Sequence, residues 1–162
     1  MKVGIVYYSR TGNTKKAAEI IREKLEKNKE NVELIEIEHA KKPGFFKAGR
    51  AAMRQTELPI KNKDYNLEKY DTILVGSPTW AGKPSPYLRT FFNKAENLKG
   101  KQAGIFITGS ASGEKNQKTS DNLKDYLEKK GLKTIDKTLN LQVKKEEIKE
   151  EKTIDDFLKN IK

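Results

Sequence analysis

The sequence contains no cysteine. This absence excludes a disulfide framework, a thiolate metal site and a cysteine nucleophile. It also fits the cytoplasm, where we expect the protein to reside, because disulfides are uncommon in that compartment. Histidine is nearly absent as well, since His39 is the only one. No acid–base partner for His39 is evident, so we interpret it as a loop residue and expect neither a catalytic side chain nor a metal site.

Long apolar runs are missing too. The apolar stretch at residues 1–8 is short and contains Lys2. It is too short for the core of a signal peptide or for a membrane-spanning helix. No other segment approaches the roughly 18 apolar residues that would suggest a span. We therefore expect a soluble protein that does not use a membrane.

Charge, in contrast, is abundant. Charged residues make up 35% of the chain and its formal net charge is +11, whereas about 25% charged residues is usual for a globular domain. The lysines are spread along the chain and alternate with glutamates, as in residues 146–152. No zinc-ligand spacing, RNA-binding aromatic motif or basic arm accompanies them. We interpret the charge as a solvated surface and expect no nucleic-acid partner, while acidic protein partners fit it.

The 162 residues suit one domain, and their pattern alternates between strand and helix signals. Strands are predicted over residues 3–7, 32–37, 72–75, 103–108 and 132–141, and helices over 13–27, 86–94, 116–130 and the remainder, including Ile148, Ile154, Phe157, Leu158 and Ile161. The long connection 39–69 contains an amphipathic stretch, 45–53, that predicts a further helix, whereas 61–68 predicts a surface loop. Such alternation is typical of a doubly wound parallel α/β sheet with helices on both faces.

Ligands of such sheets bind beyond the carboxyl ends of the strands, so the segments that follow the strands matter most. After the first strand, residues 9–14 read Ser-Arg-Thr-Gly-Asn-Thr and open directly into a helix. Hydroxyls and backbone N–H groups at a helix N-terminus suit a phosphate group. The loop is neither a triphosphate-binding loop nor a Gly-x-Gly-x-x-Gly motif. An ordinary helix N-cap at Thr11 or Asn13 is the alternative interpretation.

Two further strand ends carry similar signals. Residues 76–86 contain three prolines, two glycines and Trp80, the only tryptophan of the chain. We interpret this segment as a stiff loop that presents Trp80 for stacking on a flat aromatic ligand, although packing on the core is the alternative. Residues 108–113 read Thr-Gly-Ser-Ala-Ser-Gly, which would let the backbone approach a ring edge. Each segment is ambiguous alone, but together they predict a phosphate end, a stacking wall and a hydrogen-bonding rim.

With these three segments in this order, the sequence resembles the flavodoxin superfamily. Residues 9–14 look like the family's Ser/Thr-x-Thr-Gly-x-Thr loop for the phosphate of FMN, 76–86 look like its second flavin loop, and 108–113 fall where its third should be. The resemblance covers nearly the whole chain. It implies one flavodoxin-like domain over residues 1–162, a three-layer sandwich whose five-stranded parallel sheet has the order 2-1-3-4-5, and non-covalently bound FMN.

The resemblance also implies roles for individual residues. Trp80 would cover one face of the isoalloxazine ring. The phosphate would be bound by Ser9, Thr11, Asn13 and Thr14. The ring or the ribityl chain would meet the backbone of Thr79, Gly82, Gly109 and Ser110. The complete expected site comprises Ser9, Arg10, Thr11, Gly12, Asn13, Thr14, Pro78, Thr79, Trp80, Ala81, Gly82, Lys83, Thr108, Gly109, Ser110 and Gly113.

Two departures from the family pattern bear on function. Residues 108–117 contain no aromatic side chain, whereas many flavodoxins place one there over the second flavin face. That face is then open, or covered by another element such as Phe45 or Phe46. Many flavodoxins are also acidic, and this chain is basic.

Three functions remain open at this point. The leading expectation is an electron carrier that shuttles electrons between redox partner proteins, as a monomer or homodimer. The alternative is an NAD(P)H-dependent FMN or quinone reductase, which an open flavin face would favour. A binding module without redox function is the third.

Overall fold

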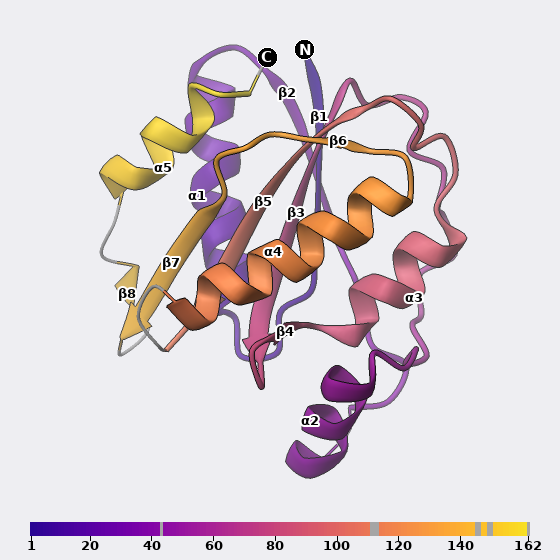
Figure 1. Ribbon diagram of the computed structural model, residues 1–162. Coiled ribbons are helices and arrows are strands. Elements are labelled where there is room, and N and C mark those ends of the chain that lie inside the picture. The colour runs from indigo at the N-terminus through magenta and orange to yellow at the C-terminus, as the bar shows by residue number, and fades with distance from the viewer. Residues whose placement is uncertain (43, 111–113, 145–146, 149–150, 162) are drawn as a thin grey trace.

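The computed structural model describes the chain except residues 43, 111–113, 145–146, 149–150 and 162 (Figure 1). The five long strands of its central sheet are parallel and lie in the spatial order β2, β1, β3, β5, β7, and two-residue strands at 83–84, 133–134 and 147–148 extend the sheet. The bounds of the long strands are β1 (Lys2–Tyr7), β2 (Asn31–Glu36), β3 (Thr72–Trp80), β5 (Gln102–Gly109) and β7 (Leu139–Lys144). Counted along the chain, this is the predicted order 2-1-3-4-5, and the predicted fold class is confirmed.

Helices cover both faces of the sheet (Figure 1). On one face lie α1 (Asn13–Lys27) and α5 (Glu151–Leu158), and on the other lie α3 (Pro86–Lys94) and α4 (Glu114–Lys129). Ala17, Ile21 and Leu25 of α1 are buried against the first face. Their spacing of three to four residues places them on one side of the helix, as an amphipathic helix requires. The same spacing buries Leu123 and Leu127 of α4 on the second face.

Helix boundaries agree closely with the sequence signals. The helices α1 and α3 begin and end at the predicted residues. Before α1, Gly12 has a φ of 93°, which a side chain would disfavour. Pro86 stands at the start of α3, where its missing N–H costs no hydrogen bond. Beyond α4, Gly131 has a φ of 92°, as is usual where a helix ends.

The last third of the chain departs from the predictions in two places. The strand expected over 132–141 is two strands, β6 (Lys133–Thr134) and β7, because the chain leaves β5 after Thr134 and pairs with it again from Leu139. The intervening residues include Asp136, a residue type disfavoured in strands, which is exposed and forms an ion pair with Lys124 of α4 at 3.3 Å. Ile148 belongs to the short strand β8 (Glu147–Ile148) and not to the final helix, which is α5 alone.

The segment 76–86 is also not the loop that its prolines and glycines suggested. Strand β3 continues through Gly76 and Pro78 to Trp80, pairing with β5 along Gly76–Pro78, and then turns back into β4 (Lys83–Pro84). The two turn residues, Ala81 and Gly82, both have positive φ, 50° and 73°. This geometry belongs to a tight two-residue hairpin. Trp80 is therefore held on a strand rather than on a free loop.

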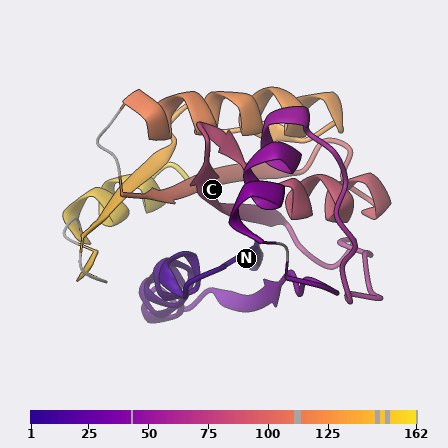
Figure 2. The ribbon, with the colours of Figure 1, turned by 90° about the horizontal axis from the view of Figure 1, so that it is seen from below.

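Between β2 and β3, helix α2 (Phe45–Arg54) forms as the amphipathic pattern predicted. It projects beyond the carboxyl edge of the sheet, apart from the two helical layers (Figures 1 and 2). Residues 61–68 contain no helix, as expected, although Leu67 is buried. In the described part of the chain, no helix is both long and apolar enough to cross a membrane.

Candidate functional site

The carboxyl ends of β1, β3 and β5 meet at one edge of the sheet, because these strands are parallel neighbours (Figure 1). The three segments that the sequence singled out begin there. The first is the loop before α1, the second is the β3–β4 hairpin, and the third follows β5. Gly113, at the far end of the third segment, lies outside the described residues.

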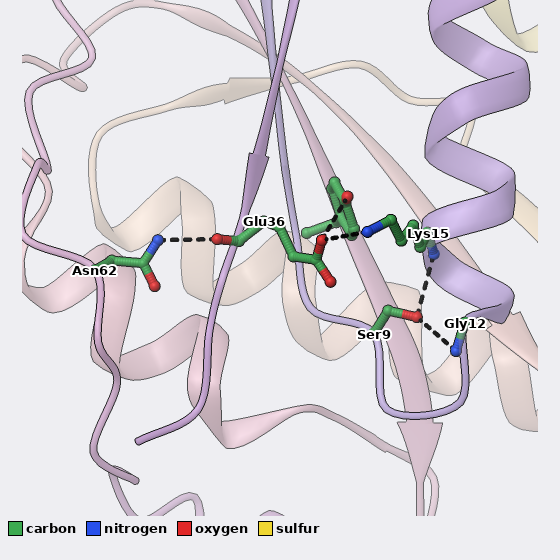
Figure 3. Close-up of polar contacts among 6 residues, drawn as sticks. Ser9, Gly12, Lys15, Glu36 and Asn62 are labelled. Atoms are coloured by element: carbon green, nitrogen blue, oxygen red, sulfur yellow. Dashed lines mark hydrogen bonds and ion pairs between the residues drawn. The ribbon is translucent and has the colours of Figure 1, made fainter. Parts of the chain in front are cut away.

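The first loop curls around the hydroxyl of Ser9. The Ser9 Oγ accepts hydrogen bonds from the backbone N–H groups of Gly12 and Lys15, at 3.1 and 3.2 Å (Figure 3). The Asn13 side-chain amide donates to Thr11 Oγ1 at 3.3 Å. Among the described residues other than its two chain neighbours, no atom lies within 4 Å of the Cβ position that a side chain at Gly12 would fill. Hydroxyls and a side-chain amide are thus gathered at the open N-terminus of α1, which fits a phosphate group.

Lys15 is directed away from this open space. Its Nζ lies 2.9 Å from Glu36 Oε2 at the end of β2, and this contact raises the pKa of Lys15. The same carboxylate accepts a hydrogen bond from the Tyr7 hydroxyl at 3.3 Å, and the Glu36 carbonyl accepts one from Asn62 at 2.9 Å (Figure 3). The network ties the start of α1 to β2 and balances the charge of Lys15.

The first and second segments are joined by a cation–π contact. The Arg10 guanidinium lies 5.6 Å from the centre of the Trp80 ring system. Trp80 is half-buried, and its ring meets Tyr8 edge-on at 5.6 Å and Tyr87 at 6.2 Å. Burial raises the pKa of Tyr8 to about 12. Tyr8 and Tyr87 thus support Trp80 from the core side.

The first and third segments are joined by a buried hydrogen bond. Thr14 Oγ1 and Thr108 Oγ1 lie 2.8 Å apart, and both residues are buried. The Thr14 hydroxyl therefore points toward β5, whereas the polar side chains of Ser9, Thr11 and Asn13 form hydrogen bonds within the first loop and the start of α1.

Asn116 of α4, a residue that the sequence did not single out, lies between the second segment and Gly109 of the third. Its Oδ1 accepts a hydrogen bond from Thr79 Oγ1 at 2.9 Å, and its Nδ2 donates to the Leu141 carbonyl at 3.5 Å. A side chain at Gly109 would come within 2.3 Å of the same Oδ1. An asparagine in a helix usually faces solvent, and only the glycine at 109 signals in the sequence that another group fills this space.

A cavity of about 460 Å³ opens between the hairpin and the end of β5. Six of its lining residues are Thr79, Ala81, Gly82, Gly109, Ser110 and Asn116. A second cavity, of about 330 Å³, shares Thr79 and Ala81 with the first and is bordered by Arg10 and Trp80 and by Phe45 and Gly49 of α2. The first has a backbone-rich wall that suits a ring edge, and the second brings α2 beside Trp80.

Three other residues from the sequence analysis have different surroundings. Lys83 Nζ donates to Asn122 Oδ1 of α4 at 2.9 Å, so its charge is directed away from the first loop. The Pro78 carbonyl accepts a hydrogen bond from the buried Ser77 hydroxyl at 2.8 Å, which belongs to the hairpin's own packing. His39 Nδ1 lies 3.4 Å from the Tyr8 hydroxyl, next to the aromatic cluster rather than in either cavity.

Known proteins resemble this chain both in sequence and in fold. Residues 5–155 match the family model described as flavodoxin. The chain is 28% identical over 119 residues to the minor allergen Alt a 7 of Alternaria alternata, covering 69% of this chain and 58% of that protein. It is 24% identical over 141 residues to an NAD(P)H quinone oxidoreductase of Candida albicans, covering 83% and 49%. The chain thus spans about half the length of these curated relatives.

Solved structures resemble the chain over nearly its full length. A flavoprotein in complex with FMN from Lactobacillus acidophilus has a TM-score of 0.67 and 26% identity, covering 86% of this chain and 91% of that chain. The oxidised flavodoxin 1 of Bacillus cereus has a TM-score of 0.65 and 20% identity, covering 99% and 97%. At 20% identity, the likeness to the Bacillus cereus flavodoxin shows a shared fold.

Proposed function

The chain belongs to the flavodoxin family and FMN is its cofactor, and from this premise we propose that it carries electrons between partner proteins. Bound FMN supplies reversible uptake of electrons. The chain's own residues would bind it, orient it and leave one edge accessible. The first loop would hold the phosphate, the β3–β4 hairpin would present Trp80 to the ring, and the cavity beside Gly109 would receive the ring's polar edge.

One observation carries this proposal: the three strand-end segments are joined in every pairwise combination. Arg10 contacts Trp80, Thr14 bonds to Thr108, and Pro78 pairs with Thr108 between β3 and β5. A site whose parts are connected in this way is preorganised, so little conformational freedom is lost when a rigid ligand binds. The spacing of phosphate loop, aromatic wall and backbone rim suits a ligand with a phosphate at one end and a flat ring at the other.

A reductase is the second candidate. The quinone oxidoreductase relative favours it, and so do Lys115 and Lys118, exposed side chains that border the cavity of about 460 Å³. Cationic side chains there would attract the phosphates of a nicotinamide dinucleotide. Hydride transfer would then occur at this site, with the dinucleotide as electron donor.

An anaerobic reduction experiment separates the two candidates. The FMN-loaded protein is mixed with NADPH, and in parallel with dithionite, while the flavin absorbance is followed. A carrier should keep its absorbance with NADPH and lose it with dithionite. Rapid loss with NADPH, slowed in a Lys115→Gln/Lys118→Gln variant but not in Lys129→Gln, would overturn the carrier proposal in favour of the reductase.

A further inference from the structure

Helix α2 displays its large apolar side chains to solvent. Phe45, Phe46 and Met53 are 80%, 92% and 68% exposed, while its buried residues are the small Ala48, Ala51 and Ala52. This arrangement reverses that of an ordinary surface helix, which turns its large apolar side chains toward the core. We call the outward set the α2 surface, and it consists of Phe45, Phe46, Lys47, Arg50, Met53 and Arg54.

The orientation of α2 is held at both of its ends by α3. The Tyr87 hydroxyl donates to the Lys41 carbonyl at 3.0 Å, four residues before the helix. After the helix, Arg89 Nη2 donates to Gln55 Oε1 at 3.3 Å, and the backbone N–H of Leu58 donates to Thr90 Oγ1 at 3.0 Å. These contacts anchor the segments on either side of α2, while burial of Ala48, Ala51 and Ala52 leaves Phe45, Phe46 and Met53 facing solvent.

The α2 surface adjoins the proposed cofactor site. The cavity of about 330 Å³ is bordered by Phe45, Ala48 and Gly49 on the α2 side and by Arg10 and Trp80 on the other. Figure 2 views the carboxyl edge of the sheet directly and shows α2 in front of it. A molecule docked on α2 would therefore lie next to the proposed flavin site, across the cavity that Phe45 and Trp80 share.

The charge of the α2 surface favours an acidic partner protein over a second copy of this chain. The apolar centre is flanked by Lys47, Arg50 and Arg54, all exposed, and α2 contains no acidic residue. A second copy docked on the same surface would bring two such cationic rims together, in a chain whose net charge is already +11, and like charges in contact oppose association. A protein with acidic residues around a small apolar centre is complementary to it.

The area of the exposed apolar side chains on α2 indicates how long-lived a complex there would be. A fully exposed aromatic side chain offers about 150–250 Å², so the three apolar side chains offer roughly 500 Å² in all. A stable interface buries about 800 Å² on each partner, whereas transient redox complexes bury less than about 600 Å² on each. The apolar centre of the α2 surface alone is therefore smaller than the contact of a permanent dimer, which favours a transient complex.

We propose that the α2 surface is the docking site of an acidic redox partner protein, which it holds transiently beside the cofactor site. The inference rests on the proposed electron-carrier function and adds to it the place and the chemistry of partner binding. The phenylalanines would supply short-range apolar contact, and the cationic rim would orient the incoming acidic surface.

The test uses a surrogate partner of known charge. The FMN-loaded, ¹⁵N-labelled protein is titrated with the soluble haem domain of cytochrome b5, an acidic one-electron acceptor, and in parallel with cytochrome c, a basic one. Cytochrome b5 should shift the α2 resonances and cytochrome c should not. Phe45→Ser/Phe46→Ser should raise the dissociation constant at least about tenfold. Lys47→Gln/Arg50→Gln should raise it about three- to tenfold at low salt, with a smaller effect at high salt.

A matched control changes the same number of charges at the other end of the molecule. Lys27→Gln/Lys129→Gln alters the exposed last residues of α1 and α4 and should leave both the α2 shifts and the affinity nearly unchanged. Equal weakening by the two charge variants, or shifts by cytochrome b5 that avoid α2, would overturn the proposal. So would sedimentation showing a dimer that Phe45→Ser/Phe46→Ser dissolves, or binding to phosphatidylserine vesicles without binding to cytochrome b5.

The flavin itself distinguishes failure of this inference from failure of the proposed function. If the protein binds FMN and dithionite reduces it reversibly, but cytochrome b5 ignores α2, only the docking site is wrong. If FMN does not bind, or NADPH reduces it rapidly, the carrier function fails whatever the titration with cytochrome b5 shows.

Discussion

Thr14 and Thr108 bring their hydroxyl oxygens to 2.8 Å from each other, although 94 positions separate them in the sequence. Both residues are nearly inaccessible to solvent, at 2% and 3% exposure. The bond joins the first turn of α1 to the last residues of β5. It therefore sets the distance between the loop proposed to hold the phosphate and the strand end proposed to meet the flavin ring.

Breaking this bond should destabilise the protein. Thr108→Val keeps the shape of the side chain but leaves the Thr14 hydroxyl buried without its partner, which should lower the free energy of unfolding by about 1–3 kcal/mol. The double variant Thr14→Val/Thr108→Val should lose less than the sum of the two single losses, because neither hydroxyl is then left unpaired. Urea unfolding of all four proteins measures this coupling, and strictly additive losses would show that the hydroxyls do not interact.

Gly76 should tolerate no side chain. A Cβ there would lie 2.1 Å from Cζ of the buried Phe106 ring, so Gly76→Ala should lower the free energy of unfolding by about 1–3 kcal/mol through overpacking. Gly49→Ala is the matched control, because Gly49 is in α2 and, outside its two chain neighbours and the backbone of its own helix, no atom of the described residues lies within 4 Å of its Cβ position. That change should stabilise the protein by about 0.5–1 kcal/mol. Thermal unfolding compares the two, and a neutral Gly76→Ala would place the Phe106 ring elsewhere.

Glu33 should contribute to loss of stability in acid. Hydrogen bonds from Lys69 and Tyr70, both 2.6 Å long, lower its pKa to about 2. Because the folded pKa lies below the unfolded value of about 4.3, this stability is present above about pH 4.3 and is lost as the pH falls toward 2. The side chain is 38% exposed, and solvent screening limits the contribution to about 1 kcal/mol or less.

The Glu33→Gln variant checks this pH dependence. Its free energy of unfolding should fall less than that of the wild type between pH 5 and about pH 2. Glu23→Gln, at an exposed position on α1, should follow the wild type. If Glu33→Gln and the wild type lose stability in parallel over this range, the hydrogen bonds to Glu33 contribute nothing to folding.

The sequence predicted the helices better than the strand ends. The boundaries of α1 and α3 could be recognised because local features define them, namely apolar spacing, Gly12 and Pro86. The hairpin was missed because Gly76 and Pro78 are individually poor strand residues. Gly76 is favoured in β3 only because the ring of Phe106 occupies the space of its missing side chain, and a single sequence does not reveal that partner.

For the candidate site, too, features within one short segment could be predicted, whereas contacts between distant segments could not. Its three segments could be recognised from composition and from the resemblance to a family. The contacts that join them could not, since Thr14 and Thr108 are 94 positions apart and only the fold brings them together. The outward orientation of Phe45 and Phe46 was equally hidden, because spacing predicts a helix but does not say which side the rest of the protein covers.

Trp80 should contribute to binding of the ring and not of the phosphate. Trp80→Ala should weaken FMN and riboflavin by the same amount, about 1–3 kcal/mol, through lost stacking and apolar contact. Trp80→Phe should restore part of the loss. Since Trp80 is the only tryptophan, its fluorescence should also be quenched as either ligand binds. Unchanged fluorescence at saturation would place the ring away from Trp80.

The most direct measurement of the central claim is a calorimetric comparison of FMN with riboflavin, which lacks the phosphate, on the wild type and on Thr11→Ala. Thr11 precedes Gly12 in the loop before α1, and its Oγ1 accepts a hydrogen bond from Asn13. The wild type should bind FMN at least about tenfold more tightly than riboflavin, because charge-assisted hydrogen bonds to a phosphate are strong. Thr11→Ala should weaken FMN alone. Equal affinity of the wild type for the two ligands, or equal weakening of both by Thr11→Ala, would contradict a phosphate site at residues 9–14.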